Sequence, residues 1–129
     1  MLLRITLSEP APLESWGRID TAVSSELIRL ECLRTIDRAR IQLRLMDDAV
    51  SEQRANLLEA IDGIDLAPLT TPILERAADP FPTAIGSLDA LHLATALLVR
   101  ERYGDLLFAT HDHALALAAR AMGFRVEGV

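Results

Sequence analysis

The amino-acid sequence predicts an α/β sandwich, in which helices cover both faces of a short parallel β-sheet. Half of the residues are apolar but only 4% are aromatic, which favours closely packed helices rich in leucine, alanine and isoleucine. Helical and extended patterns alternate along the chain, and residues 106–109 form a continuous apolar run, typical of a strand covered on both faces. With 129 residues the chain can build one hydrophobic core, so we expect a single domain over residues 1–129.

The first part of the chain predicts a short helix, a short strand and a long helix. Glu9-Pro10 opens the short helix, because proline is tolerated in a first turn. Residues 22–23 form a brief strand. The long helix runs from about Glu26 past Ile36 and is apolar around most of its circumference, which predicts burial; one of the serines at 24–25 would accept its free amide hydrogens.

The middle of the chain predicts a helix, a strand and a second, shorter helix. The first helix begins at Asp47-Asp48 and ends at Asp62-Gly63. Residues 64–69 read as a strand, and Thr71-Pro72 supplies the N-cap and the first-turn proline of the shorter helix. A proline-bracketed loop over residues 79–82 follows. The core-facing stripe of the first helix comprises Val50, Arg54, Leu57, Leu58 and Ile61.

The last part of the chain predicts a long helix over residues 87–103, capped by Ser87 and stopped at Gly104. The apolar strand described above comes next, then a helix over about residues 114–122 and an edge strand over residues 124–126. Active sites in such sheets lie at the carboxyl ends of the strands, so functional residues are expected there.

Composition limits the cellular setting. No stretch reaches the roughly 18 consecutive apolar residues of a membrane span, and no cleavable signal pattern is visible, so we expect a cytoplasmic protein without a membrane partner. The single cysteine, Cys32, falls among apolar neighbours and is expected to be a small core residue.

The net charge of −6 is unusual for a protein that binds nucleic acid, but the basic residues are unevenly distributed. A stretch rich in arginine could hold phosphate groups bidentately. The alternative is an ordinary solvated helix face, paired with Asp37, Asp47 and Asp48. The arginines concerned are Arg29, Arg34, Arg38, Arg40 and Arg44.

Three carboxylates, Glu31, Asp89 and Asp112, occupy positions where the pattern predicts apolar or neutral residues. Glu31 lies inside the buried helix, Asp89 sits in the first turn of the most apolar helix, and Asp112 closely follows the apolar strand. We expect them to converge at one edge of the sheet, where their oxygens would suit a hard cation, Mg²⁺ or Mn²⁺. Each also has a structural explanation: Asp89 stabilises a helix N-terminus, Asp112 caps the final helix, and Glu31 pairs with Arg34.

Three segments resemble, in order and spacing, the motifs of VapC-type PIN domains. They are residues 24–34 (SSELIRLECLR), residues 88–96 (LDALHLATA) and residues 110–112 (THD) with Leu115. The central segment is the most specific of the three, and together they span nearly the whole chain. The resemblance implies a PIN-like three-layer sandwich.

The resemblance also implies a divalent-metal-dependent endoribonuclease, the toxin of a toxin–antitoxin pair. Acids of the family hold one or two divalent ions that activate water for cleavage of RNA, and three of these acids carry over onto Glu31, Asp89 and Asp112 as catalytic and metal-binding residues. Thr110 matches the family's accessory hydroxyl, and Arg34 is our candidate RNA contact within the arginine stretch. A VapB-like antitoxin that masks the acidic cleft and a homodimer built through helices are further implied.

The family begins with a strand that ends in an aspartate ligand, and this sequence has no counterpart to it. Residues 1–5 resemble the first helix already under way, and Asp20 is a poor substitute for the aspartate. We therefore expect a PIN-like domain that is N-terminally truncated, with its first, central strand absent. Either the true start lies upstream, which we favour because a sheet without its middle strand leaves backbone groups unpaired, or the strand has been lost.

The truncation motivates an alternative function, a catalytically impaired PIN-like module that dimerises or captures antitoxin without cleaving RNA. A phosphohydrolase of another α/β family is a distant third. His92 lies in a helix with little polar company, and we expect it to be a satisfied, partly buried imidazole; we assign no catalytic role to it, to His111 or to His113.

Overall fold

The computed structural model describes residues 21–129, in which helices and short strands alternate. The predicted helix at Glu9-Pro10, the segment 1–5 and Asp20 lie outside the described residues. The elements are β1 (Val23–Ser25), α2 (Leu27–Gln42), α3 (Asp47–Asp62), β2 (Asp65–Ala67), α4 (Thr71–Ala78), α5 (Ser87–Tyr103), β3 (Leu107–Ala109), α6 (His113–Ala121) and β4 (Arg125–Glu127). The predicted order of helices and strands from residue 22 onward is confirmed.

The described strands form two separate parallel pairs. β1 pairs with β2, with Val23 opposite Asp65, and β3 pairs with β4, with Leu107 opposite Arg125. No ladder joins the two pairs within residues 21–129. This is the arrangement expected of a sheet whose central strand is not among the described residues.

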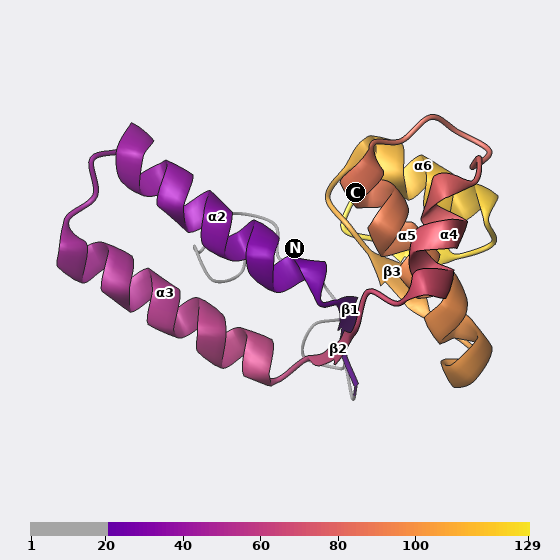
Figure 1. Cartoon of the computed structure of the whole chain (residues 1–129), viewed down its shortest axis with the longest axis horizontal. Helices are drawn as coiled ribbons and strands as arrows, with labels where there is room; N and C mark the ends of the chain where they lie inside the picture. Colours follow the sequence, from indigo (N-terminus) through magenta and orange to yellow (C-terminus); the bar gives the residue numbers. More distant parts are fainter. Residues whose placement is uncertain (1–20) are drawn as a thin grey trace.

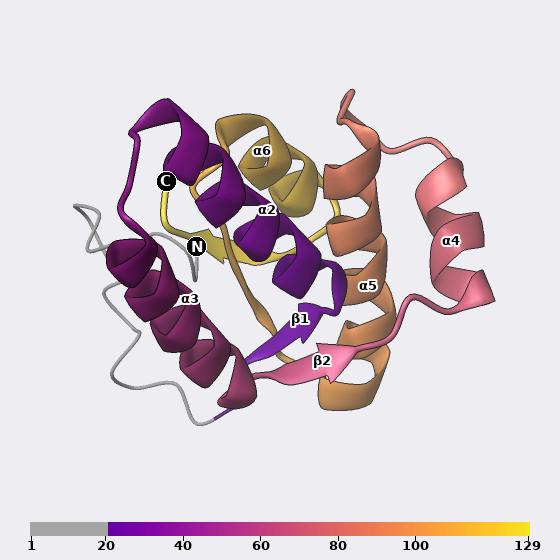
Figure 2. The same ribbon diagram turned by 60° about the vertical axis from the view of Figure 1, so that its left-hand side comes forward.

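The helices are divided between two sides of these strands (Figure 1). α2 and α3 form a long antiparallel hairpin, whereas α4, α5 and α6 pack together on the other side, and a turned view shows β1 between α2 and α5 (Figure 2). None of the helices in the described part of the chain is long and apolar enough to span a membrane.

The apolar core consists of two clusters. One joins α2 to α3 through Cys32, Ile36, Leu57 and Ile61, which confirms Cys32 as a small buried residue. The other joins α5, β3 and α6, and its buried members are Leu93, Phe108, Leu115, Ala118, Ala119 and Phe124.

We predicted that the apolar run at residues 106–109 is covered on both faces, and this prediction is wrong. Phe108 is buried in the second cluster, but Leu107 is 38% exposed. Leu107 borders the cavity described below instead of a packed layer. β3 is therefore a strand that packs against the core on one side, through Phe108.

Two predicted helix caps are displaced by one residue. Gly86 and Thr70 occupy the N-cap positions of α5 and α4 with extended backbones, and neither makes a side-chain capping bond, so Ser87 and Thr71 lie inside their helices. The serine ahead of α2 behaves as predicted, because the Leu27 amide donates to Ser25 Oγ at 3.1 Å.

Candidate active site

A cavity of about 660 Å³ lies between β1 and β3 and collects the residues that the sequence singled out. Glu31, Asp89 and Asp112 all line it, and so does Thr110. These residues come from α2, from the first turn of α5, and from the segment that joins β3 to α6. The fold thus brings three acids that are far apart in the sequence to one cavity.

The charge of Asp89 is affected by the other two acids. Burial raises the pKa of its carboxyl above the usual 3.8, and the carboxylates of Asp112 and Glu31 raise it further, while the nearby His92 lowers it. Neighbouring carboxylates disfavour the charged form of a carboxyl, and they do so more strongly where burial reduces screening by water. The three acids therefore form an electrostatic group around Asp89.

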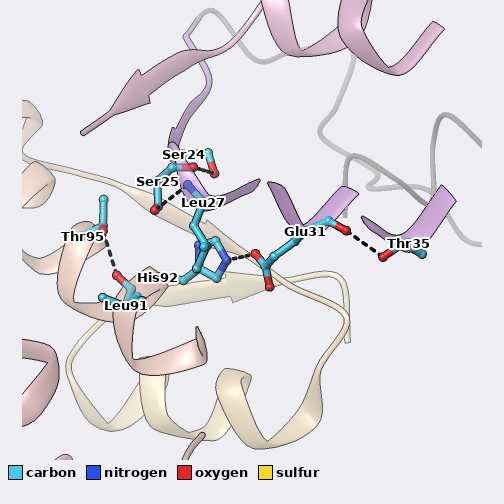
Figure 3. A network of polar contacts seen from close by, with 8 residues as sticks. All are labelled: Ser24, Ser25, Leu27, Glu31, Thr35, Leu91, His92 and Thr95. Atoms are coloured by element: carbon cyan, nitrogen blue, oxygen red, sulfur yellow. Dashed lines mark hydrogen bonds and ion pairs between the residues drawn. The ribbon is translucent and has the colours of Figure 1, made fainter. Parts of the chain in front are cut away.

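Glu31 has a different partner from the one that the sequence suggested. Its Oε1 contacts Nε2 of His92, so the expected pairing with Arg34 is wrong. His92 is a partly buried imidazole with a partner, as predicted, although the expectation of little polar company around it is wrong. Figure 3 shows the two side chains pointing toward each other from α2 and α5. His92 lies three residues after Asp89, so both lie on the same side of α5. This spacing was the feature of the sequence that could have placed His92 beside the acids.

Asp112 and Thr110 form a local network at the start of α6. The Leu115 amide donates to Asp112 Oδ1 at 2.8 Å, which confirms the predicted cap. The Asp112 amide in turn donates to Thr110 Oγ1 at 3.1 Å, and Thr110 is only 8% exposed. The hydrogen bond from the Leu115 amide orients the Asp112 carboxylate through Oδ1, and Oδ2 takes no part in that bond.

Loss of this cap should be measurable as a loss of stability. Asp112→Ala is expected to lower the free energy of unfolding by about 1 kcal/mol, because the Leu115 amide loses its acceptor. Urea unfolding in the presence of EDTA measures the change. Asp112→Asn keeps an acceptor oxygen and is the matched control; equal stability of the alanine and asparagine variants would show that the cap contributes nothing.

Arg34 lies away from the cavity. Its guanidinium donates to Asp37 at 3.1 Å, and its side chain is 64% exposed. Arg40 pairs in the same way with Asp47 at 3.2 Å. These pairs agree with a solvated helix face, and contact of Arg34 with RNA remains a prediction.

His111, which follows β3, has a backbone partner rather than an acidic one. His111 Nδ1 hydrogen-bonds to the carbonyl of Gly128. Its Nε2 is buried without a hydrogen-bond partner among the described residues. His111 therefore ties the start of α6 to the end of the chain.

The donor atoms in the cavity suit a hard divalent cation, but their arrangement is incomplete. Carboxylate oxygens are the preferred ligands of Mg²⁺ and Mn²⁺. Within residues 21–129, however, no three acidic, histidine or cysteine side chains lie close enough to hold one ion together. The three acids share a cavity without forming a finished coordination sphere.

Comparison with known proteins agrees with the motifs and the fold. Residues 1–121 match the PIN domain family. The chain is also 32% identical over 130 residues to a protein described as ribonuclease VapC47 of Mycobacterium tuberculosis (strain CDC 1551 / Oshkosh), an alignment that covers 95% of this chain and 88% of the relative. No solved structure matches significantly. The chain therefore belongs to the PIN-domain family and is a PIN protein of the VapC type.

Proposed function

We propose that this chain is a divalent-metal-dependent endoribonuclease, the toxin of a VapBC-type toxin–antitoxin pair. The observation that carries the proposal is that Glu31, Asp89 and Asp112 all line one cavity, and that they follow β1 or β3 or begin α5. Its relative is described as a ribonuclease. Clustered carboxylates repel an anionic substrate unless a cation offsets their charge, so the proposal includes Mg²⁺ or Mn²⁺.

The three acids would hold that cation, which when bound polarises a phosphoryl oxygen and lowers the pKa of water. The side chains around the cavity would supply the negative charge that attracts the cation and the contacts that orient the carboxylates. Asp89 is the centre of the acid group, and Asp112 is oriented by the Leu115 amide. His92 contacts Glu31, and the Thr110 hydroxyl lies beside Asp112. Arg34, on the exposed side of α2, would contact a phosphate of the RNA.

The proposed partners are RNA, a VapB-like antitoxin and a second copy of the chain, all in the cytoplasm. Large apolar side chains are exposed around the tip of the α2–α3 hairpin, where they would suit a protein interface. Ile41 is 73% exposed, Leu43 69% and Met46 72%.

A PIN-like module that dimerises or captures antitoxin without cleaving RNA is the second candidate. The observation in its favour is that the described residues do not form a group able to hold a metal ion. Calorimetric titration with Mn²⁺ separates the two functions, because the module should show no saturable uptake near neutral pH.

The direct test of the proposed function is cleavage of labelled RNA by the purified chain. We expect internal cuts with Mg²⁺ or Mn²⁺ present and their complete loss in EDTA, restored by excess metal. Glu52→Gln, which changes an exposed acid of α3 outside the cavity, is the control and should cut normally. Cleavage that persists in EDTA would contradict the metal-dependent mechanism, and intact RNA together with no Mn²⁺ uptake would favour the binding module.

A further inference from the structure

The three acids of the cavity are carried by different core clusters. Asp89 lies on α5, whose Leu93 is fully buried. Asp112 accepts a hydrogen bond from the amide of Leu115, and both leucines belong to the cluster that joins α5, β3 and α6. Glu31 lies on α2, which packs against α3 through the other cluster. The position of Glu31 relative to the other two acids is therefore not fixed by a shared core.

A hydrogen bond between side chains links Glu31 to the helix of Asp89. Nε2 of His92 on α5 contacts Oε1 of Glu31, and these two residues are 61 apart in the sequence. A carboxylate can only accept a hydrogen bond, so the imidazole nitrogen donates. In Figure 3 the imidazole reaches from α5 toward the carboxylate on α2. The contact bridges the two core clusters.

Both residues of this pair border the cavity. His92 and Glu31 line it from α5 and α2, and Asp89 lines it three residues before His92 on the same helix. Residues three apart on a helix lie on the same side of it, so His92 and Asp89 are neighbours there. His92 therefore connects the acid that it contacts with the acid on its own helix.

The surroundings of the pair allow the bond to control where the Glu31 carboxylate lies. The side chain of His92 is 20% exposed and that of Glu31 is 34% exposed. Water competes less with a hydrogen bond in partly buried surroundings than at a fully exposed surface. A glutamate side chain that nothing holds samples many rotamers, and ordering it costs conformational entropy. The bond from His92 removes part of that freedom before any ligand binds.

The spacing of the acids makes such control useful. Within the described part of the chain, no three ligating side chains lie close enough to hold one ion directly. Mg²⁺ usually keeps several waters and binds through one or two carboxylates, so a further acid can act on the hydrated ion from a short distance. That acid helps only if its position is fixed.

We infer that His92 is a positioning residue, which holds the Glu31 carboxylate at the cavity so that a divalent cation or its waters meet a prearranged oxygen. The inference rests on the proposed metal-dependent function. Oε2 of Glu31 takes no part in the bond with His92. Since hard cations prefer carboxylate oxygens to imidazole nitrogens, His92 acts through Glu31 and does not ligate the ion.

Calorimetric titration of the full chain with Mn²⁺ near neutral pH tests this role in three variants. His92→Leu has no donor and should weaken Mn²⁺ binding at least about tenfold. His92→Gln places an amide donor about as far from the backbone as Nε2 does, so it should bind Mn²⁺ nearly as well as the unmodified chain. His92→Asn carries the same amide on a shorter side chain and should bind as weakly as His92→Leu.

The glutamine and asparagine variants differ by one methylene, so they decide the question even if His92→Leu does not fold. Equal Mn²⁺ affinity of these two variants would overturn the inference. If the unmodified chain takes up no Mn²⁺, the proposed function and the inference fail together. If it binds Mn²⁺ and all three variants bind it equally well, only the inference fails.

Pulsed EPR of the bound Mn²⁺ separates positioning from direct ligation. A positioning residue contributes no imidazole nitrogen coupling to the spectrum of the ion, so the unmodified chain and His92→Gln should give the same spectrum. Nitrogen coupling that is present in the unmodified chain and disappears in His92→Gln would show that His92 binds the ion itself, which would overturn the inference.

Discussion

Replacing Asp89 by asparagine is expected to abolish RNA cleavage and, at the same time, to stabilise the protein near neutral pH. Cleavage should fall by at least about 100-fold, because even residues that only support metal ligands commonly cost 10- to 100-fold in affinity or activity. Asparagine preserves the shape of the side chain. The loss would therefore report the missing charge at the centre of the acid group.

The stability change follows from the raised pKa of Asp89. A carboxyl whose pKa is higher in the folded than in the unfolded state binds protons more tightly when folded, so it lowers stability as pH rises from its ordinary 3.8 through the raised value. Asparagine carries no such charge. The advantage of Asp89→Asn over the unmodified chain should be absent below the ordinary pKa, grow through the raised pKa and persist at pH 7.

Urea unfolding in EDTA at pH 3 and pH 7 measures this effect without bound metal. Asp37→Asn is the matched control, since that carboxylate pairs with Arg34 on an exposed surface and should change stability little. An asparagine variant at position 89 that is no more stable than the unmodified chain at pH 7 would show that neither burial nor the neighbouring acids penalise the charge of Asp89 in the folded state.

Replacing Leu93 by alanine is expected to produce the largest loss of stability. Leu93 is fully buried in α5 and belongs to the cluster that joins α5 to β3 and α6. Truncation of a buried leucine costs 2–5 kcal/mol, from lost burial and from the cavity left behind, so about 3 kcal/mol is expected. For a protein of this size that is a large part of the total stability.

Leu88→Ala provides the comparison within the same helix. Leu88 lies in the first turn of α5 and is 50% exposed, so its truncation should cost less than about 1 kcal/mol. Denaturant midpoints of the two variants at constant slope give the difference. Equal midpoints would mean that α5 is not anchored through Leu93.

Truncation of Leu93 should also displace residues of the candidate active site. Leu93 immediately follows His92 in α5, and Asp89 lies one turn earlier. A shift of this helix would therefore move Asp89 and His92 together.

Much of the fold was accessible from the sequence, because the helices have local signals. The α3 segment was predicted by an apolar stripe, α2 and α5 by their apolar composition, and the ends of α3 and α5 by the glycines that follow them. The caps of α4 and α5 were misplaced by one residue, because Thr70 and Gly86 occupy the N-cap positions through their extended backbones and make no side-chain capping bond. Periodicity cannot resolve that difference.

The candidate site was accessible only in part. Glu31, Asp89 and Asp112 stood out because each is a charge in an apolar context, and the fold places all three at one cavity. The partner of Glu31 was missed: Arg34 is close in sequence, but helix geometry turns it to solvent, where it meets Asp37. His92, 61 residues away in sequence, makes the contact.

The sequence by itself determined which segments become helices and strands, which acids are out of place, and which family the chain resembles, because these properties depend on local periodicity, local charge and motif order. Only the tertiary structure decided that Glu31 meets His92 and that Arg34 does not reach the cavity. Such contacts join segments remote in the chain, and their geometry arises from the packing of α2 and α5 around β1.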